Sequence, residues 1–418
     1  MLRAGALFVA VTISFVIAVL SSMLILMAYH YKIQNRENLL QKKLERNVNS
    51  ALTLLMVESE SSEQAKLIDL YGEESDSVQI KNYSWGVFEV ATVKAFSGRY
   101  SVTKSVEYGY KPDETFSSAI YLADLSRPLN LCGKTKIIGD CYLPESGVKR
   151  GYIEGKSFEG TIMINGNVKS SKNTLPALNK EIIKKLSNLF TNEAFGTGLY
   201  RRLDLVGVDT LITSFLDTTV LVALSGNTTI AGKFLSGNII IYSTSPILIE
   251  ENSRLEDIIL VAPSIKLKKG FRGSIQAFAT DSIIVEENCI LNYPSALGLI
   301  KKDHKTTQPF IKVMKNAILS GIAFTSQSEF VSDLQQTLIS IDKDALLIGQ
   351  LYADGFADIK GEVRGMVWCN KFILKTASSV YENHLLDAVI DRSKLSIHFV
   401  GSGIIASGKM KKIIKYTE

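Results

Sequence analysis

The sequence has few of the residues from which metal centres and catalytic sites are built. It contains four cysteines and four histidines among 418 residues, and the histidines show no metal-ligand spacing. No paired C-x-x-C supplies half of a zinc site, and the short motifs "GTG" and "GSG" lack the flanking pattern of a phosphate loop or a nucleophile elbow. We therefore predict a non-enzymatic protein with no metal, no cofactor and no catalytic residue.

An excess of charge of one sign is also absent. The formal net charge is +5, and Lys and Arg are interspersed with Asp and Glu. This balance excludes the electrostatic footprint of a nucleic-acid-binding protein, so we predict no nucleic-acid partner. A hydrophobic content of 46% and a charged content of 21% indicate a globular chain.

One long uncharged segment is present at the N-terminus. Residues 4–29 are apolar except for a few Thr and Ser. This length spans a bilayer as a helix, and it exceeds a typical signal-peptide core with no prompt cleavage site after it. We predict a single transmembrane helix that contacts membrane lipid through residues 4–29. Beyond it Leu44, Val48 and Ala51 recur at helical spacing, which predicts an amphipathic extension of the helix.

The first residues carry a family resemblance. "RAGALFVAV" (residues 3–11), the unbroken apolar helix and "RNVNSALTLL" resemble the N-terminus of type IV pilin-like proteins and the minor pseudopilins of type II secretion. The resemblance implies a short basic leader that a prepilin peptidase removes after Gly5, and an exposed helix that packs into a filament. Most members have Glu at the fifth mature position, where this chain has Ala10.

The distribution of basic residues and the spacing of two cysteines predict different sides of the membrane for the C-terminal part of the chain. Basic residues are more numerous after the apolar segment than before it, so the positive-inside rule places the large C-terminal part in the cytoplasm. Cys132 and Cys141 have eight residues between them, a spacing that lets a loop close through a disulfide in an oxidising compartment. With the pilin-like resemblance, this favours a single-pass inner-membrane protein whose C-terminal domain lies outside the cytoplasm, in the periplasm or at the surface.

Five similar nine-residue segments occupy the second half of the chain. They start at residues 247, 265, 283, 311 and 339, in steps of 18 or 28 residues. This repeat predicts a parallel β-helix, or β-solenoid, with about 18-residue rungs and loops inserted in the longer steps. In rung length and in its Gly and Asn corners the region resembles bactofilin-like domains and other right-handed β-helices.

The aligned columns predict the geometry of the repeat. The first and third positions are Ile, Leu or Val throughout, so they form apolar ladders in the interior. In the first three segments the fourth and fifth positions alternate in charge, as Glu250 and Glu251, Lys268 and Lys269, and Glu286 and Glu287, which predicts contacts between opposite charges on neighbouring rungs. The sixth position holds residue types that tolerate positive φ, which predicts a left-handed corner at Asn252, Gly270, Asn288, Asn316 and Asp344.

The predicted fold is mainly β, and its organisation has four parts. Residues 1–70 form the transmembrane helix with its extension, 71–200 a small α+β region, 201–385 the parallel β-helix and 386–418 a C-terminal cap. Within the second part, alternation over residues 85–110 predicts a β-hairpin. A helix is predicted over residues 175–190, with Thr174 available as its N-cap.

These features predict a membrane-anchored structural or assembly protein with protein partners in the cell envelope. The pilin-like start implies a minor-pilin-like subunit of a secretion or appendage system. The alternative is a membrane-tethered β-helix that binds or cleaves polysaccharide, with Asp354 and Asp358 of "DGFAD" as candidate paired carboxylates. A simpler interpretation of that pair is two solvated loop aspartates beside a turn glycine.

Overall fold

The computed structural model describes residues 2–57, 65–72, 76–112, 117–191, 200–226, 228–301, 308–327, 336–376, 378–405 and 410–417. The chain is mainly β with one long N-terminal helix, as predicted. It divides into two compact units. The first contains Met1–Lys81 and Thr92–Lys104, and the second contains Asn82–Ala91 and Ser105–Glu418.

A five-stranded sheet carries the predicted hairpin. Its strand order is β1 (Lys66–Ile68), β2 (Ser77–Trp85), β3 (Phe88–Ser97), β4 (Tyr100–Tyr110) and β31 (Lys411–Tyr416). The turn between β3 and β4 is Gly98 and Arg99, and Gly98 has a φ of 56° that suits glycine. The hairpin is therefore confirmed. The C-terminal strand β31 pairs antiparallel with β4.

The two halves of helix α1 (Leu2–Val57) differ in the exposure of their apolar side chains. Its N-terminal half exposes its apolar side chains, among them Phe15 at 67% and Leu24 at 68%, and it is long and apolar enough to cross a membrane. The second half buries Leu44, Val48 and Ala51, which confirms the predicted apolar stripe. The helix ends at Val57, before the predicted boundary at residue 70.

Polar contacts within the first unit hold the second half of α1. The buried Asn47 donates its side-chain amide to Asp76, and Lys43 lies 3.4 Å from the same carboxylate. Further along the helix, Asn49 accepts a hydrogen bond from Lys104 on β4 at 3.1 Å. The second half of α1 is thus fixed on its sheet by the buried apolar stripe and by these polar contacts.

The second unit contains a closed, largely parallel system of hydrogen-bonded strands, called here the parallel array. Its first strands are β13 (Arg201–Leu203), β14 (Thr210–Thr213), β15 (Val220–Leu224), β16 (Thr229–Ile230), β17 (Phe234–Gly237), β18 (Ile239–Ser243) and β19 (Ile247–Ile249). The following strands are β20 (Arg254–Leu267), β21 (Arg272–Val285), β22 (Ile290–Lys301), β23 (Phe310–Val313), β24 (Ile318–Gln327), β25 (Thr337–Ile341), β26 (Leu346–Ile359) and β27 (Glu362–Lys375).

The register of the array is the one that the repeat predicts. Successive first positions pair in parallel, as Ile247 with Ile265, Ile265 with Ile283, Ile283 with Ile311, and Ile311 with Ile339. All five isoleucines are buried, and so are the third positions. The apolar ladders are therefore confirmed, and they line the larger hydrophobic core.

The corner column is confirmed at four of its five positions. Asn288, Asn316 and Asp344 have φ values of 58°, 58° and 63°, and Gly270 has 86°. Asn252 has no positive φ, and it instead accepts a hydrogen bond from the backbone of Gly232 at 2.9 Å. The prediction for Asn252 is wrong, because an asparagine tolerates a left-handed turn without requiring one.

The charge contacts follow the prediction in part. Lys269 lies 3.2 Å from Glu287, as expected for neighbouring segments. Glu286 makes its ion pair with Lys266 at 2.7 Å, where the alternation predicts Lys268. Exposed pairs of this kind contribute at most about 1 kcal/mol each, so the apolar ladders dominate the stability of the register.

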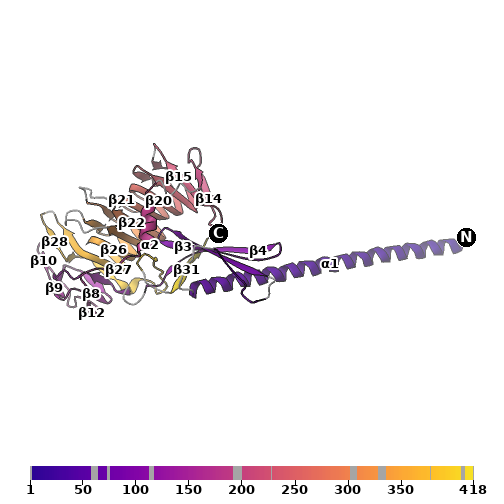
Figure 1. The fold of residues 1–418 in the computed structure, drawn as a ribbon, viewed down its shortest axis with the longest axis horizontal. Helices are drawn as coiled ribbons and strands as arrows, with labels where there is room; N and C mark the ends of the chain where they lie inside the picture. The colour runs from indigo at the N-terminus through magenta and orange to yellow at the C-terminus, as the bar shows by residue number, and fades with distance from the viewer. Residues whose placement is uncertain are drawn as a thin grey trace. The chain divides into compact units, whose positions relative to one another are not determined.

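Strands from earlier in the sequence continue the array beyond β27. The prediction assigns them to the separate region 71–200, but β5 pairs in parallel with β27, β8 pairs with β5, and β12 pairs with β8. The array includes β5 (Ile120–Leu122), β7 (Lys136–Ile138), β8 (Cys141–Leu143) and β12 (Val168–Ser170). A separate three-stranded sheet contains β6 (Leu129–Cys132) and β9 (Val148–Arg150), and a two-stranded sheet contains β10 (Tyr152–Ile153) and β11 (Lys156–Ser157). Figure 1 shows β14 and β15 at one end of the array and β8 and β12 at the other.

Short elements after β27 join this end. They are β28 (Val380–Glu382), β29 (His384–Leu386), β30 (Val389–Asp391) and the 3₁₀ turn Arg392–Lys394. β30 pairs in parallel with both β27 and β7, and β29 pairs in parallel with β6. β7 and β30 thus belong to the array, whereas β29 and β6 form a separate sheet with β9.

A second hydrophobic core covers one outer face of the array. Phe278, Phe324 and Trp368 lie on that face, and they pack with Trp85 and with helix α2 (Lys180–Asn188). The N-cap of α2 is Asn179, whose side chain accepts from Glu181 and Ile182. The predicted cap Thr174 is wrong, since the helix begins later than its sequence pattern indicates.

Candidate functional site

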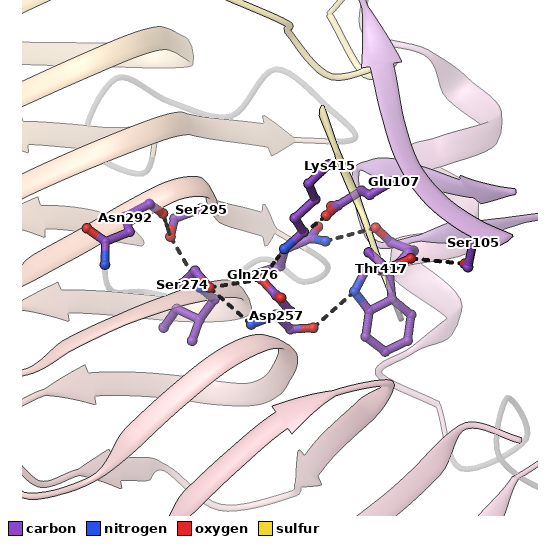
Figure 2. Close-up of polar contacts among 11 residues, drawn as sticks. Ser105, Glu107, Asp257, Ser274, Gln276, Asn292, Ser295, Lys415 and Thr417 are labelled. Carbon is purple, nitrogen blue, oxygen red and sulfur yellow. Dashed lines mark hydrogen bonds and ion pairs between the residues drawn. The ribbon is translucent and has the colours of Figure 1, made fainter. Parts of the chain in front are cut away.

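A partly buried polar cluster joins β4, β31 and the turn between β2 and β3 to the parallel array (Figure 2). Gln276 on β21 is buried, and its side chain accepts from the backbone N–H of Val87 at 2.9 Å. The same amide donates to the carbonyl of Trp85, also at 2.9 Å. Gly86 between them has a φ of 62°, and a Cβ there would lie 2.0 Å from Gln276 Oε1. The turn between β2 and β3 is thereby clamped to β21.

Asp257 is the next member of the cluster. It interrupts the pairing of β20 with β21 at a register shift, and its φ is 61°. Its carboxylate accepts from Ser274 Oγ at 2.9 Å, and its carbonyl accepts from Trp85 Nε1 at 3.2 Å. The irregular backbone therefore turns a carboxylate toward the sheet strands.

Lys415 on β31 lies between two carboxylates. It forms an ion pair with Asp257, and its Nζ is 3.4 Å from Glu107 Oε2 on β4. Figure 2 shows the lysine between these two side chains. Nearby, Thr417 donates to Ser105 Oγ at 2.9 Å, which adds a second link between the C-terminal end and β4.

Glu107 is the most perturbed member of the cluster. It is 2% exposed, and this burial raises its pKa to about 7, with the charge of Asp257 acting in the same direction and Lys415 acting against it. A carboxyl group with such a pKa changes charge near neutral pH. No pattern in the sequence indicates this cluster, because Glu107, Asp257 and Lys415 come from three distant segments.

A hollow of about 770 Å³ lies elsewhere on the second unit, beside the corners of the array. Its ionisable lining is evenly balanced, with Lys156, Lys343, Lys360 and Lys375 against Glu154, Asp344, Glu362 and Asp387. Lys156 is already paired with Asp387 at 2.8 Å. This volume is within the range of ligand sites, but the balanced charge favours no ion of one sign.

The two candidate carboxylates of the polysaccharide alternative are not loop residues. Asp354 and Asp358 both lie in β26, and burial raises the pKa of each. Asp354 accepts from Asn370 and from the backbone of Gln327, whereas Asp358 pairs with Lys360 at 3.2 Å. The interpretation as solvated loop aspartates is therefore wrong. Neither residue lines the 770 Å³ hollow.

The predicted disulfide residues lie on strands of two different sheets. Cys132 ends β6 and Cys141 begins β8, and both are buried free thiols. Burial raises the pKa of Cys141 to about 12, and burial also raises the pKa of Cys132. Both thiols are therefore poor nucleophiles at neutral pH. Their disulfide stays a prediction for an oxidising compartment.

Two further predictions concern processing and metals. Gly5, the predicted last leader residue, lies in the exposed half of α1, and no atom comes within 4 Å of the position that a Cβ would take there. The helix therefore presents Gly5 without obstruction. In the described part of the chain, no group of three or more His, Cys, Asp or Glu side chains is placed to hold a metal ion.

Comparison with known protein families, curated proteins and solved structures finds no match to this chain.

Proposed function

We propose that this protein is a non-enzymatic, membrane-anchored subunit of an envelope assembly. The observation that carries the proposal is the division of α1. One half exposes a continuous apolar surface, and the other half is fixed on the sheet of its own unit. An exposed apolar helix of this length is unfavourable in water and stable in a bilayer or against other helices.

The rest of the chain supports an assembly role. The parallel register supports a β-helix with repeated rungs, which offers a rigid head on the anchor. The head lies outside the cytoplasm in this proposal, as a single-pass inner-membrane topology with a pilin-like leader requires. Its partners are other proteins of the envelope, which the exposed helix and the head contact.

The mature N-terminus tests the pilin-like part of the proposal. Prepilin-type processing after Gly5 gives a chain that starts at Ala6, and mass spectrometry of the purified protein reads this directly. A matched Gly5→Val variant is expected to keep Met1, because the leader then lacks its terminal glycine. A wild-type chain that retains Met1 would remove the minor-pilin-like assignment and leave only a membrane-anchored scaffold.

Polysaccharide binding is the second candidate, and the hollow of about 770 Å³ is the observation that favours it. A glycan-binding screen tests it, with Lys343→Ala in the lining as the disrupting variant. Asp354→Ala serves as the comparison, because Asp354 lies outside the hollow. Binding that survives Lys343→Ala and disappears with Asp354→Ala would place the glycan elsewhere.

A further inference from the structure

The cluster around Lys415 has two acids and one base, and Glu107 is its buried member. Glu107 and Asp257 share the single ammonium group of Lys415, and both Asp257 and Lys415 are partly exposed, so ionisation of both acids leaves a net negative charge at the buried Glu107 carboxylate. Such a charge is costly in a low-dielectric site unless water enters or the groups separate. With Glu107 protonated, the cluster is a neutral Lys415–Asp257 pair.

We propose that Glu107, Asp257 and Lys415 form a pH-sensitive latch, closed when Glu107 is protonated, that holds β4 and β31 against β20. Opening separates residues 105–110 and 411–416 from the array and admits water to Glu107. This inference is independent of the membrane anchor, because every group of the latch belongs to the second unit.

Four groups on neighbouring elements interact with the charge of Glu107. They are Lys415 on β31, Asp257 on β20, Tyr83 on β2 and Tyr293 on β22. Partial burial raises the pKa of each tyrosine, and the charge of Glu107 acts in the same direction. Both are therefore neutral over the range in which Glu107 titrates. Among these four groups, Lys415 alone stabilises the ionised form of Glu107.

The sign of the pH dependence follows from the raised pKa of Glu107. The folded value is about 7 against an ordinary pKa of 4.5 for a glutamate, so proton binding favours the closed latch. This stabilisation is complete below about pH 4.5 and is lost as the pH rises to about 7. From these two values, the opening constant is expected to increase about tenfold between about pH 6 and pH 8.5.

Hydrogen exchange of the full chain in detergent measures this opening. Exchange at residues 105–110 and 411–416, corrected for the intrinsic pH dependence, is expected to accelerate about tenfold over that range. Residues 283–285, inside the array, are expected to show no such change. Wild-type exchange at 411–416 that is equal at the two ends of the range would overturn the proposal.

Three variants identify the titrating group. Glu107→Gln is expected to abolish the pH dependence, and a dependence that persists in this variant would overturn the latch. Asp257→Asn keeps a residue that tolerates positive φ, and it is expected to move the transition to lower pH because Lys415 then serves one acid. An unmoved transition in Asp257→Asn would also contradict the proposal, even if Glu107→Gln does not fold. The control is Glu286→Gln, an acid of the array outside the latch whose carboxylate pairs with Lys266, and it is expected to keep the wild-type pH dependence.

Discussion

Replacement of Ile17 and Leu20 by lysine is expected to remove the protein from the membrane fraction. Both residues lie in the middle of the apolar segment, and they are 57% and 55% exposed on α1. Each lysine at the centre of a transmembrane helix costs about 3 kcal/mol, so the pair costs about 6 kcal/mol. A loss of this size shifts the protein from the pellet to the soluble or degraded fraction after alkaline extraction.

The control for this variant lies on the same helix. Leu39→Lys replaces another exposed leucine, 61% exposed, beyond the apolar segment. This variant is expected to remain in the membrane pellet as the wild type does. If the double lysine variant also stays in the pellet, α1 is not the membrane anchor.

Replacement of Gly349 by alanine is expected to lower the free energy of unfolding of the second unit by about 4 kcal/mol. Gly349 pairs with Gly321 on one side and Gly365 on the other, and its φ is 141°. A Cβ at Gly349 would lie 1.9 Å from the carbonyl oxygen of Gly321. The variant therefore combines a backbone conformation that only glycine adopts readily with a clash against backbone.

The two tryptophans report this effect directly. Trp85 and Trp368 are both buried in the second unit, so their fluorescence follows its unfolding in urea. Gly147→Ala is the matched control, since Gly147 has a φ of 70° but open space around its Cβ position. It is expected to cost about 1 kcal/mol. An equal loss of unfolding free energy in the two variants would contradict the requirement for glycine where Gly321, Gly349 and Gly365 pair.

Sequence patterns were most informative where contacts are periodic. The isoleucine column from Ile247 to Ile339 is predictable because the two-residue alternation fixes the buried face and the recurrence of the nine-residue segment fixes the pairing partner. At Asn252 the residue type did not predict the backbone conformation. Its residue type permits a left-handed conformation, but the local backbone decides whether it is used.

Contacts between distant segments could not be predicted. Ile120 pairs with Val367, and no repeat in residues 117–170 has the period of the array, so its extension by earlier strands is invisible in the sequence. The latch is a similar case. Glu107 in an alternating strand acquires its raised pKa only when the fold buries it beside Lys415, which lies near the C-terminus.

Thiol labelling in spheroplasts tests the central claim most directly, namely that α1 anchors a head that lies outside the cytoplasm. All four native cysteines are buried, whereas Tyr152 is 70% exposed on β10, so Tyr152→Cys provides a single accessible thiol. We predict that a membrane-impermeant maleimide labels this variant in the membrane fraction of intact spheroplasts and leaves the wild type unlabelled. Labelling of Tyr152→Cys only after lysis would contradict the account.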